Sequence, residues 1–281
     1  MTVKGGCVKK MRTIKAEEIT QVVRDLCIEA NCHLPSDIKD AIAGCKACEP
    51  FDIARNILDR IEENYQIADE DNVPICQDTG VACVFLEIGQ EVHIIGGDVS
   101  EAVNEGVRRG YAEGYLRKSV VRDPLDRVNT GDNTPAMIYY DITAGDKIKI
   151  TVAPKGFGSE NMSQIKMLRP SDGIEGVKAF VLKAVEEAGP NPCPPIIVGV
   201  GVGGTFDKAA LLAKKALLRE TGAPSPDPLY AALEAELLEK INSLGIGPQG
   251  FGGKTTALSV AVEHYPTHIA GLPVAVNINC H

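Results

Sequence analysis

The sequence predicts one compact α/β domain, residues 1–281, in which helices and sheets are mixed. Three observations support this class. Apolar residues recur every three or four positions near the start of the chain, which is typical of helices. Further on, an apolar run passes through a glycine turn into a helical pattern, and together they form one strand–helix unit. No internal repeat, low-complexity tract or linker separates one part of the chain from another.

The first half of the chain is expected to combine a helical opening with two strands. From Ile14 to about Asn64, the apolar residues fall on one helical face. Ala82–Ile88 and Lys147–Val152 are short, rich in β-branched residues and bounded by Gly or Asp, which favours strands. These two strands flank a mixed middle region.

The second half alternates helices with buried strands. Ser171–Glu175 offers a helix start, and an apolar face continues to Gly189, where the helix is expected to end. Pro195–Gly204 (PIIVGVGVGG) is typical of a fully buried strand, and the helical pattern FDKAALLAKKALLRE follows it. After the proline-punctuated loop Thr221–Pro228, a helix over Leu229–Ile241 leads to the glycine-rich GIGPQGFGGK and two last apolar segments.

Composition and charge exclude several classes of protein. With 44% hydrophobic and 24% charged residues, the chain is expected to fold as a soluble globular protein. A formal net charge of -9 leaves no broad basic face, so nucleic acid is a poor partner. The longest apolar stretches fall well short of the roughly 20 residues that span a bilayer. The start, MTVKGGCVKKMRTIK, lacks the apolar core and cleavage site of a signal peptide, so a cytoplasmic protein is expected.

Two glycine-rich segments match nucleotide-binding loops only in part. Gly199–Gly204 follows a strand as a dinucleotide fingerprint does, but its spacing is G-x-G-x-G-G and no acidic ribose ligand follows a second strand. Close packing of strand and helix explains these glycines more simply, although their amide groups could hold a carboxylate. Gly247–Lys254 ends in G-K before Thr, but Pro248 replaces the first glycine of a phosphate loop and ALSVAVEHY alternates like a strand. ATP or GTP binding is therefore not expected.

Pairs of histidines and cysteines give weak metal signals. His264 and His268 are four residues apart, but Pro266 breaks the helix that a two-histidine zinc site uses. Cys45 and Cys48 have the CxxC spacing of a redox pair or half a zinc site, yet no second CxxC follows. Two ordinary thiols near a helix end are the simpler interpretation.

Nine cysteines, an odd number spread over the chain, favour thiols or metal ligands over a disulfide framework. Buried or inert thiols are expected at Cys7, Cys27, Cys32 and Cys83. Three others lie near Pro, Asn or Gly in turn-like backbone, where a thiolate can project into a cleft: Cys76, Cys193 and Cys280. An iron-sulfur cluster on three thiolates leaves one iron open to substrate as a Lewis acid. A fourth thiolate ligand would indicate an electron-transfer or redox-sensing protein instead.

Seven ordered blocks resemble one family when they are taken together. They are PICQDTG, LRKSVV, KGFGSEN, NPCPP, GVGGTFDKA, IGPQGFGGKTTAL and PTHIAGLPVAVNINC, and the match as a whole spans nearly the whole chain from about Ile14. As a set they resemble the class I, iron-sulfur fumarate hydratases and L(+)-tartrate dehydratases. The resemblance implies a hydro-lyase that holds a 4Fe-4S cluster on Cys76, Cys193 and Cys280.

The resemblance also implies which residues contact substrate. Gln77 and Asp78 match the pair after the first cluster ligand, and Arg117 matches a carboxylate-binding arginine suited to bidentate pairing. Gly158 matches a backbone contact, and His268 matches the active-site histidine. Asp78 and His268 are the expected catalytic residues.

A partner subunit is expected on the same ground. Single-chain members continue into a second domain that carries the catalytic base, whereas this chain stops one residue after Cys280. The resemblance therefore implies an α subunit that needs a separate β subunit, in a heterotetramer of two α and two β chains. Its substrate would be a small dicarboxylate, with fumarate and malate as the first choice and tartrate as the alternative.

In that mechanism, iron polarises the substrate hydroxyl, cationic residues steady the carboxylates and a base removes a carbon-bound proton. A nucleotide-binding regulatory module built on GVGVGG remains a third hypothesis.

Overall fold

The computed structural model describes residues 11–281. These residues form two compact units, each built from two separate stretches of the chain. Unit 1 contains residues 11–33 and Ala68–Lys155, and unit 2 contains Leu34–Ile67 and Gly156–His281. Both combine helices with sheets, so the predicted α/β class is confirmed. The organisation of the chain as one domain stays a prediction.

Unit 1 is built on a three-stranded sheet with β2 (Val81–Gly89) at its centre. β4 (Met137–Thr143) pairs with β2 in parallel, and β5 (Ile148–Lys155) pairs with it antiparallel. A separate two-stranded parallel sheet joins β1 (Arg12–Lys15) to β3 (Val92–Ile95). The predicted strands in the middle of the chain are thus confirmed as β2 and β5.

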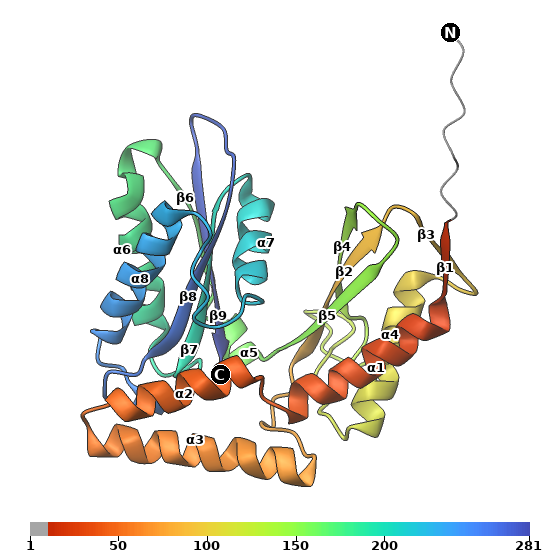
Figure 1. Cartoon of the computed structure of the whole chain (residues 1–281), viewed down its shortest axis with the longest axis horizontal. Helices are drawn as coiled ribbons and strands as arrows, with labels where there is room; N and C mark the ends of the chain where they lie inside the picture. The colour runs from red at the N-terminus through yellow and green to blue at the C-terminus, as the bar shows by residue number, and fades with distance from the viewer. Residues whose placement is uncertain (1–10) are drawn as a thin grey trace. The chain divides into compact units, whose positions relative to one another are not determined.

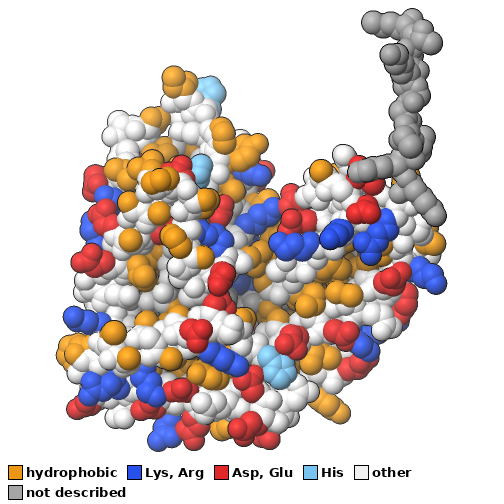
Figure 2. Space-filling model, in the orientation of Figure 1, with side chains coloured by type: hydrophobic (Ala, Val, Ile, Leu, Met, Phe, Trp, Pro, Cys, Tyr) orange, Lys and Arg blue, Asp and Glu red, His pale blue; other side chains and the backbone are white. Residues whose placement is uncertain are grey.

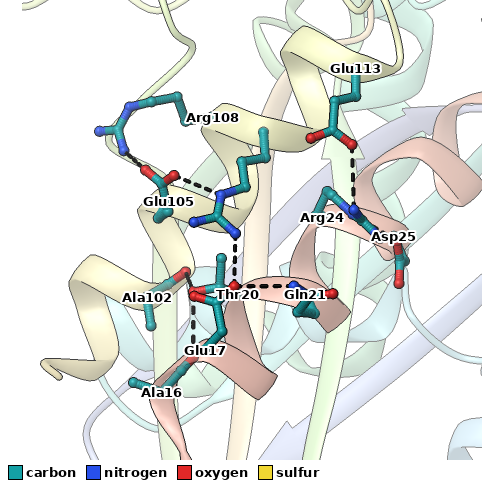
Figure 3. Close-up of polar contacts among 11 residues, drawn as sticks. Ala16, Glu17, Thr20, Gln21, Arg24, Asp25, Ala102, Glu105, Arg108 and Glu113 are labelled. Carbon is teal, nitrogen blue, oxygen red and sulfur yellow. Dashed lines mark hydrogen bonds and ion pairs between the residues drawn. The ribbon is translucent and has the colours of Figure 1, made fainter. Parts of the chain in front are cut away.

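Two helices of unit 1, α1 (Ala16–Cys32) and α4 (Val99–Glu113), share one hydrophobic core with the sheet. They approach closely, because a Cβ on Gly110 of α4 would lie 2.8 Å from the Cys27 Cβ and 2.9 Å from the Arg24 carbonyl oxygen. Polar contacts border this packing, as Figure 3 shows; Arg24 there pairs with Glu113 at 3.5 Å. The glycine of α4 therefore sets how near the two helices can lie.

Unit 2 has a four-stranded mixed sheet in the order β6 (Gln164–Leu168), β9 (Leu272–Cys280), β7 (Ile196–Gly203) and β8 (Ala257–Tyr265). β7 runs parallel to β8 and antiparallel to β9. Every residue of β7 is buried, as its apolar run predicts.

Helices cover both faces of this sheet, as Figure 1 shows for α6 and α8 on one face and α7 on the other. They are α6 (Gly173–Ala188), α7 (Phe206–Ala216) and α8 (Pro228–Asn242), and they confirm the three helices predicted for the second half. Shorter segments of this unit are α5 (Phe157–Glu160), η1 (Pro170–Asp172), η2 (Pro248–Gly250) and the loop after α7.

The helical opening is confirmed with one correction. Ile14 lies in β1, because the β-branched Thr13 and Ile14 pair with β3, and helix begins at Ala16. The pattern then forms α1 and two further helices, α2 (Ser36–Cys48) and α3 (Asp52–Asp71). α2 and most of α3 belong to unit 2, where they share a small core with strands β7 and β8.

Candidate functional site

Exposure separates the cysteines into the two groups that the sequence predicts. Cys27, Cys32 and Cys83 are buried, and burial raises the pKa of the Cys27 thiol to about 12. A thiol with so high a pKa is a poor metal ligand at neutral pH. The three predicted cluster ligands are exposed or partly exposed instead: Cys76, Cys193 and Cys280. Cys7 lies outside the described residues.

Cys45 and Cys48 stand at the end of α2, as the simpler interpretation predicts. Cys45 is partly buried, and its pKa is raised by burial and by the nearby Cys48 and Glu49. No disulfide occurs in residues 11–281, so the preference for thiols is confirmed there.

In unit 1, the first ligand lies on a loop that follows α3. Cys76 and Gln77 are exposed, and the backbone N–H of Asp78 donates to the Cys76 Sγ at 3.4 Å. The N–H of Gly80 donates to the Asp78 Oδ1 at 3.1 Å and closes the turn. The hydrogen bond from Asp78 ties the Cys76 sulfur to the backbone of its own loop.

The same loop is tied to the segment that carries Arg117. The backbone N–H of Arg117 donates to the Thr79 Oγ1 at 2.9 Å. The buried Tyr111 hydroxyl donates to the Thr79 carbonyl oxygen at 2.8 Å, and burial raises the pKa of that hydroxyl. Unit 1 therefore brings Cys76, Gln77, Asp78 and Arg117 together.

Asn133 completes this support from inside the unit. Its side chain is fully buried, and its Oδ1 accepts from the backbone N–H groups of Ser119 at 2.6 Å and Val120 at 3.2 Å. Its Nδ2 donates to the Gly80 carbonyl oxygen at 3.1 Å. One amide side chain thus joins the Cys76 loop to the LRKSVV segment. Sequence reasoning missed Thr79, Tyr111 and Asn133, although Thr79 stands within the block PICQDTG.

In unit 2, the sheet places the other two ligands at one end. Cys280 ends β9 and pairs with Ile196, the first residue of β7. Cys193, in the turn before β7, has a positive φ of 54°, and its N–H donates to the Pro190 carbonyl oxygen at 3.0 Å. The Nδ1 of His281 lies 3.3 Å from the Pro195 carbonyl oxygen, and burial lowers the pKa of that imidazole.

The glycine-rich block around η2 supports the Cys193 turn. Gln249 donates to the Pro194 carbonyl oxygen twice, from its backbone N–H at 2.7 Å and from its Nε2 at 2.9 Å. A Cβ on Gly250 would lie 2.4 Å from the Pro190 Cβ, so only glycine fits there. The glycines of this block therefore serve close backbone packing, and Gln249 is a supporting residue that sequence reasoning missed.

Glu49 occupies the amide groups of the G-K-T segment. Its buried carboxylate accepts from the N–H groups of Lys254 and Thr255, both at 2.9 Å, and from the Thr255 Oγ1 at 2.7 Å. Burial alone would raise the pKa of Glu49, but these hydrogen bonds outweigh it and lower that pKa. Since a protein carboxylate already uses these donors, the segment is not arranged to hold a phosphate.

Of the two remaining predicted residues, one joins the Cys193 and Cys280 group and one does not. A Cβ on Gly158, in α5, would lie 3.4 Å from the Asn191 carbonyl oxygen, so its backbone lies beside the Cys193 turn. His268 is exposed on the loop between β8 and β9, at the opposite end of β9 from Cys280. At about 3.3 Å per residue, β9 separates them by roughly 26 Å.

The glycine and histidine motifs have structural explanations. A Cβ on Gly199 would lie 2.2 Å from the Ala213 carbonyl oxygen, so close packing of β7 and α7 requires a glycine there, as predicted. His264 stacks on Tyr230 with ring centroids 4.0 Å apart.

Among residues 11–281, no group of three His, Cys, Asp or Glu side chains lies close enough together to hold a metal ion. The donor chemistry still suits a cluster, because the three predicted ligands are the accessible thiols of their turns. Within that same part of the chain, no helix is both long and apolar enough to cross a membrane. Basic and acidic side chains are interspersed over the face shown in Figure 2, which is unlike a nucleic-acid-binding surface.

Comparison with known proteins shows which family the chain resembles. A family model described as "Fumarate hydratase (Fumerase)" matches residues 20–281. A Methanocaldococcus jannaschii protein, provisionally named L(+)-tartrate dehydratase subunit alpha, is 49% identical over 271 residues, which are 94% of both chains. The L(+)-tartrate dehydratase subunit alpha of Escherichia coli strain K12 is 33% identical over 267 residues, covering 94% of this chain and 88% of that one.

Proposed function

This chain belongs to the fumarate hydratase (Fumerase) family of hydro-lyases, and we propose that it is the α subunit of an iron-sulfur enzyme that hydrates fumarate to malate reversibly. The observation that carries the proposal is the exposure of Cys76, Cys193 and Cys280, in contrast to the buried Cys27, Cys32 and Cys83. The thiols of the first three are accessible to a group outside the chain, whereas those of the second three are enclosed in the core.

In this proposal, Cys76, Cys193 and Cys280 would hold a 4Fe-4S cluster. When bound, the cluster supplies a Lewis acid for the substrate hydroxyl through its iron that lacks a protein ligand. The N–H of Asp78 is directed at the Cys76 sulfur. The Cys193 turn and the end of β9 present the other two thiols from a rigid sheet.

The dicarboxylate would be bound by residues beside these turns. Arg117 offers a planar guanidinium for one carboxylate, and Gln77 offers an amide on the exposed side of the Cys76 loop. Gly158 offers backbone close to the Cys193 turn. Asp78 would exchange a proton with the bound substrate. The base that removes the carbon-bound proton belongs, in this proposal, to a separate β subunit.

His268 requires a different assignment, because about 26 Å of strand separates its loop from Cys280. An imidazole cannot bridge that distance to a cluster on the same chain. We therefore propose that His268 contacts the substrate bound by a second α chain, in a heterotetramer of two α and two β chains.

The decisive experiment is anaerobic purification of this chain with its β partner, followed by assays with fumarate, malate and both tartrates. We expect the α chain alone to bind iron but to turn over at least about a hundredfold more slowly than the mixture. Titration with the β subunit should raise malate dehydration until the two are equimolar. Equal rates with and without the β subunit would mean that the base lies within these 281 residues.

L(+)-tartrate is the second candidate substrate, favoured by the names of relatives 49% and 33% identical to this chain. One additional hydroxyl distinguishes tartrate from malate. A higher kcat/KM for L(+)-tartrate than for malate in the same assays would replace our first choice.

Assignment of His268 to a neighbouring α chain is tested by mixing two inactive variants, Cys280→Ser and His268→Ala. Each hybrid would retain one complete site, so randomly assembled mixtures should recover about a quarter of wild-type activity. No recovery would remove His268 from the neighbouring site.

A further inference from the structure

The polar cluster at the end of α5 lies outside the predicted site residues, yet it contacts the two segments that carry Gly158 and Cys280. Figure 1 shows α5 beside the end of β9, near the C-terminus. Glu160 is the last residue of α5, and Asn277 stands on β9 three residues before Cys280.

Glu160 is bound from two directions. The Lys214 Nζ, on α7, donates to its Oε1 at 2.7 Å, and the Asn277 Nδ2 donates to its Oε2 at 2.8 Å. Lys214 also lies 3.5 Å from the Asn277 Oδ1. The side chains of Glu160 and Lys214 are only 27% and 16% exposed, so water screens this ion pair weakly.

The turn that follows α5 is also held by hydrogen bonds to β9, from Asn277 and its neighbour Ile278. Asn277 is buried, and its Nδ2 donates to the Ser163 Oγ at 2.6 Å. The N–H of Ile278 donates to the same Oγ at 3.4 Å. Both Glu160 and Ser163 are therefore attached to β9, on the strand that ends in Cys280.

On its other side, this segment contacts the Cys193 turn. The Gly158 backbone lies against the Asn191 carbonyl, and the Asn191 Nδ2 donates to the Met162 Sδ at 3.6 Å. The segment that carries the predicted substrate contact thus spans from β9 to the turn before β7. Its position depends on Glu160, because that carboxylate is the link shared by α5, α7 and β9.

We propose that Glu160, held by Lys214 and Asn277, is a positioning residue that fixes the Gly158 backbone relative to Cys193 and Cys280 and thereby sets substrate affinity. This inference rests on the proposed function. Glu160 itself touches neither substrate nor metal in this proposal. Loss of the carboxylate leaves Lys214 without its partner in a weakly solvated place, and the α5 turn can then move away from the ligand turn.

The test compares three variants of the assembled α and β enzyme: Glu160→Gln, Lys214→Met and Lys214→Arg. We expect the first two to raise KM for malate by about tenfold or more, with a smaller change in kcat and unchanged iron content, because misplacement by about 1 Å impairs substrate positioning. Lys214→Arg keeps the cation and should restore most of the affinity.

Lys178→Met is the matched control. Lys178 is a lysine of similar exposure in unit 2, with 12% of its side chain exposed, and it pairs with Glu236 of α8 at 2.7 Å. Its loss should lower the melting temperature without raising KM. Unchanged KM in Glu160→Gln and Lys214→Met, or an equal rise in the control, would overturn the inference while wild-type turnover upholds the proposed function. Absence of turnover in the wild-type complex would overturn both.

Discussion

The two parts of the candidate site are held by different kinds of structure. In unit 1, the Cys76 loop depends on a few polar side chains, namely its own Thr79 and the more distant Tyr111 and Asn133. In unit 2, Cys280 ends a strand paired with β7 over seven residues, and Cys193 stands in the turn that enters β7. The first arrangement can fail through one distant substitution. The second is distributed over many backbone hydrogen bonds.

This difference indicates which part of the candidate site should be more sensitive to a single substitution. A loop held by a few buried polar groups loses its shape when one is removed, because each unsatisfied partner costs about 1–3 kcal/mol. A strand end in a sheet that is covered on both faces is held by many backbone hydrogen bonds to its neighbouring strands, so the loss of one contact has a smaller effect.

The largest effect is expected from replacement of the predicted ligands, and it tests the ligand set. Cys76→Ser in unit 1 and Cys280→Ser in unit 2 should each remove the visible absorption and iron of the anaerobically reconstituted protein, because three thiolates are needed. Cys27→Ser, which alters a buried thiol, should leave iron content unchanged. Full iron content after replacement of all three predicted ligands would refute the ligand set.

Sequence alone predicted much of the fold, where apolar patterns were long and regular. The helices α6 and α8 and the strands β2 and β7 follow directly from such patterns. α4 was missed because polar residues and two glycines interrupt its apolar face, and β1, β3 and β6 because four or five residues show too little periodicity.

For the site, the turn-like backbone predicted from sequence is found at Cys76 and Cys193, whereas Cys280 ends a paired strand, and sequence did not show what supports these residues. Asn133 carries no motif signal, since its role depends on a buried position reached only after folding. The distance of His268 from Cys280 was also missed, because most of the residues between them form one extended strand, Leu272–Cys280, and the family blocks carry no information on spatial separation. The family resemblance supplied residue roles that neither pattern nor spacing could give.

A substitution at Asn133 tests the sensitivity of unit 1. Asn133→Ala leaves the N–H groups of Ser119 and Val120 and the carbonyl of Gly80 without their partner, so we expect a loss of about 3 kcal/mol in the free energy of unfolding. Urea unfolding of the apo chain measures it. Asn129→Ala, in the same loop but exposed, should cost less than about 1 kcal/mol. Equal costs would contradict the special role of Asn133.

Glycine substitutions compare the helix packing of the two units. Gly110→Ala should destabilise unit 1 by about 2 kcal/mol, because its Cβ would lie 2.8 Å from that of Cys27. Gly44→Ala, in α2 of unit 2, meets nothing within 4 Å and should stabilise the chain by up to about 1 kcal/mol through helix propensity. Thermal unfolding followed by circular dichroism gives both values. A neutral Gly110→Ala would mean that α1 and α4 can separate at no cost.

The smallest expected effect is the acid dependence of the loop around Asp132, which lies beside Asn133. Burial alone would raise the pKa of Asp132, but hydrogen bonds from Thr134 and the Arg108 guanidinium, 3.0 Å away, lower it from 3.8 to about 2. A carboxylate whose pKa is lower in the folded state stabilises fully above pH 3.8, and that contribution is lost as the pH falls towards 2.

Because 29% of the Asp132 side chain is exposed, solvent screening should reduce this contribution to about 1 kcal/mol. Asp132→Asn should therefore be less stable than wild type at about pH 6, and the difference should shrink towards pH 2. Asp126→Asn, whose ion pair with Arg122 is largely exposed, should show no such change. Urea unfolding of the apo chains at several pH values measures these differences in the free energy of unfolding. Parallel stability curves for wild type and Asp132→Asn would show that the loop of unit 1 is held by its neutral hydrogen bonds alone.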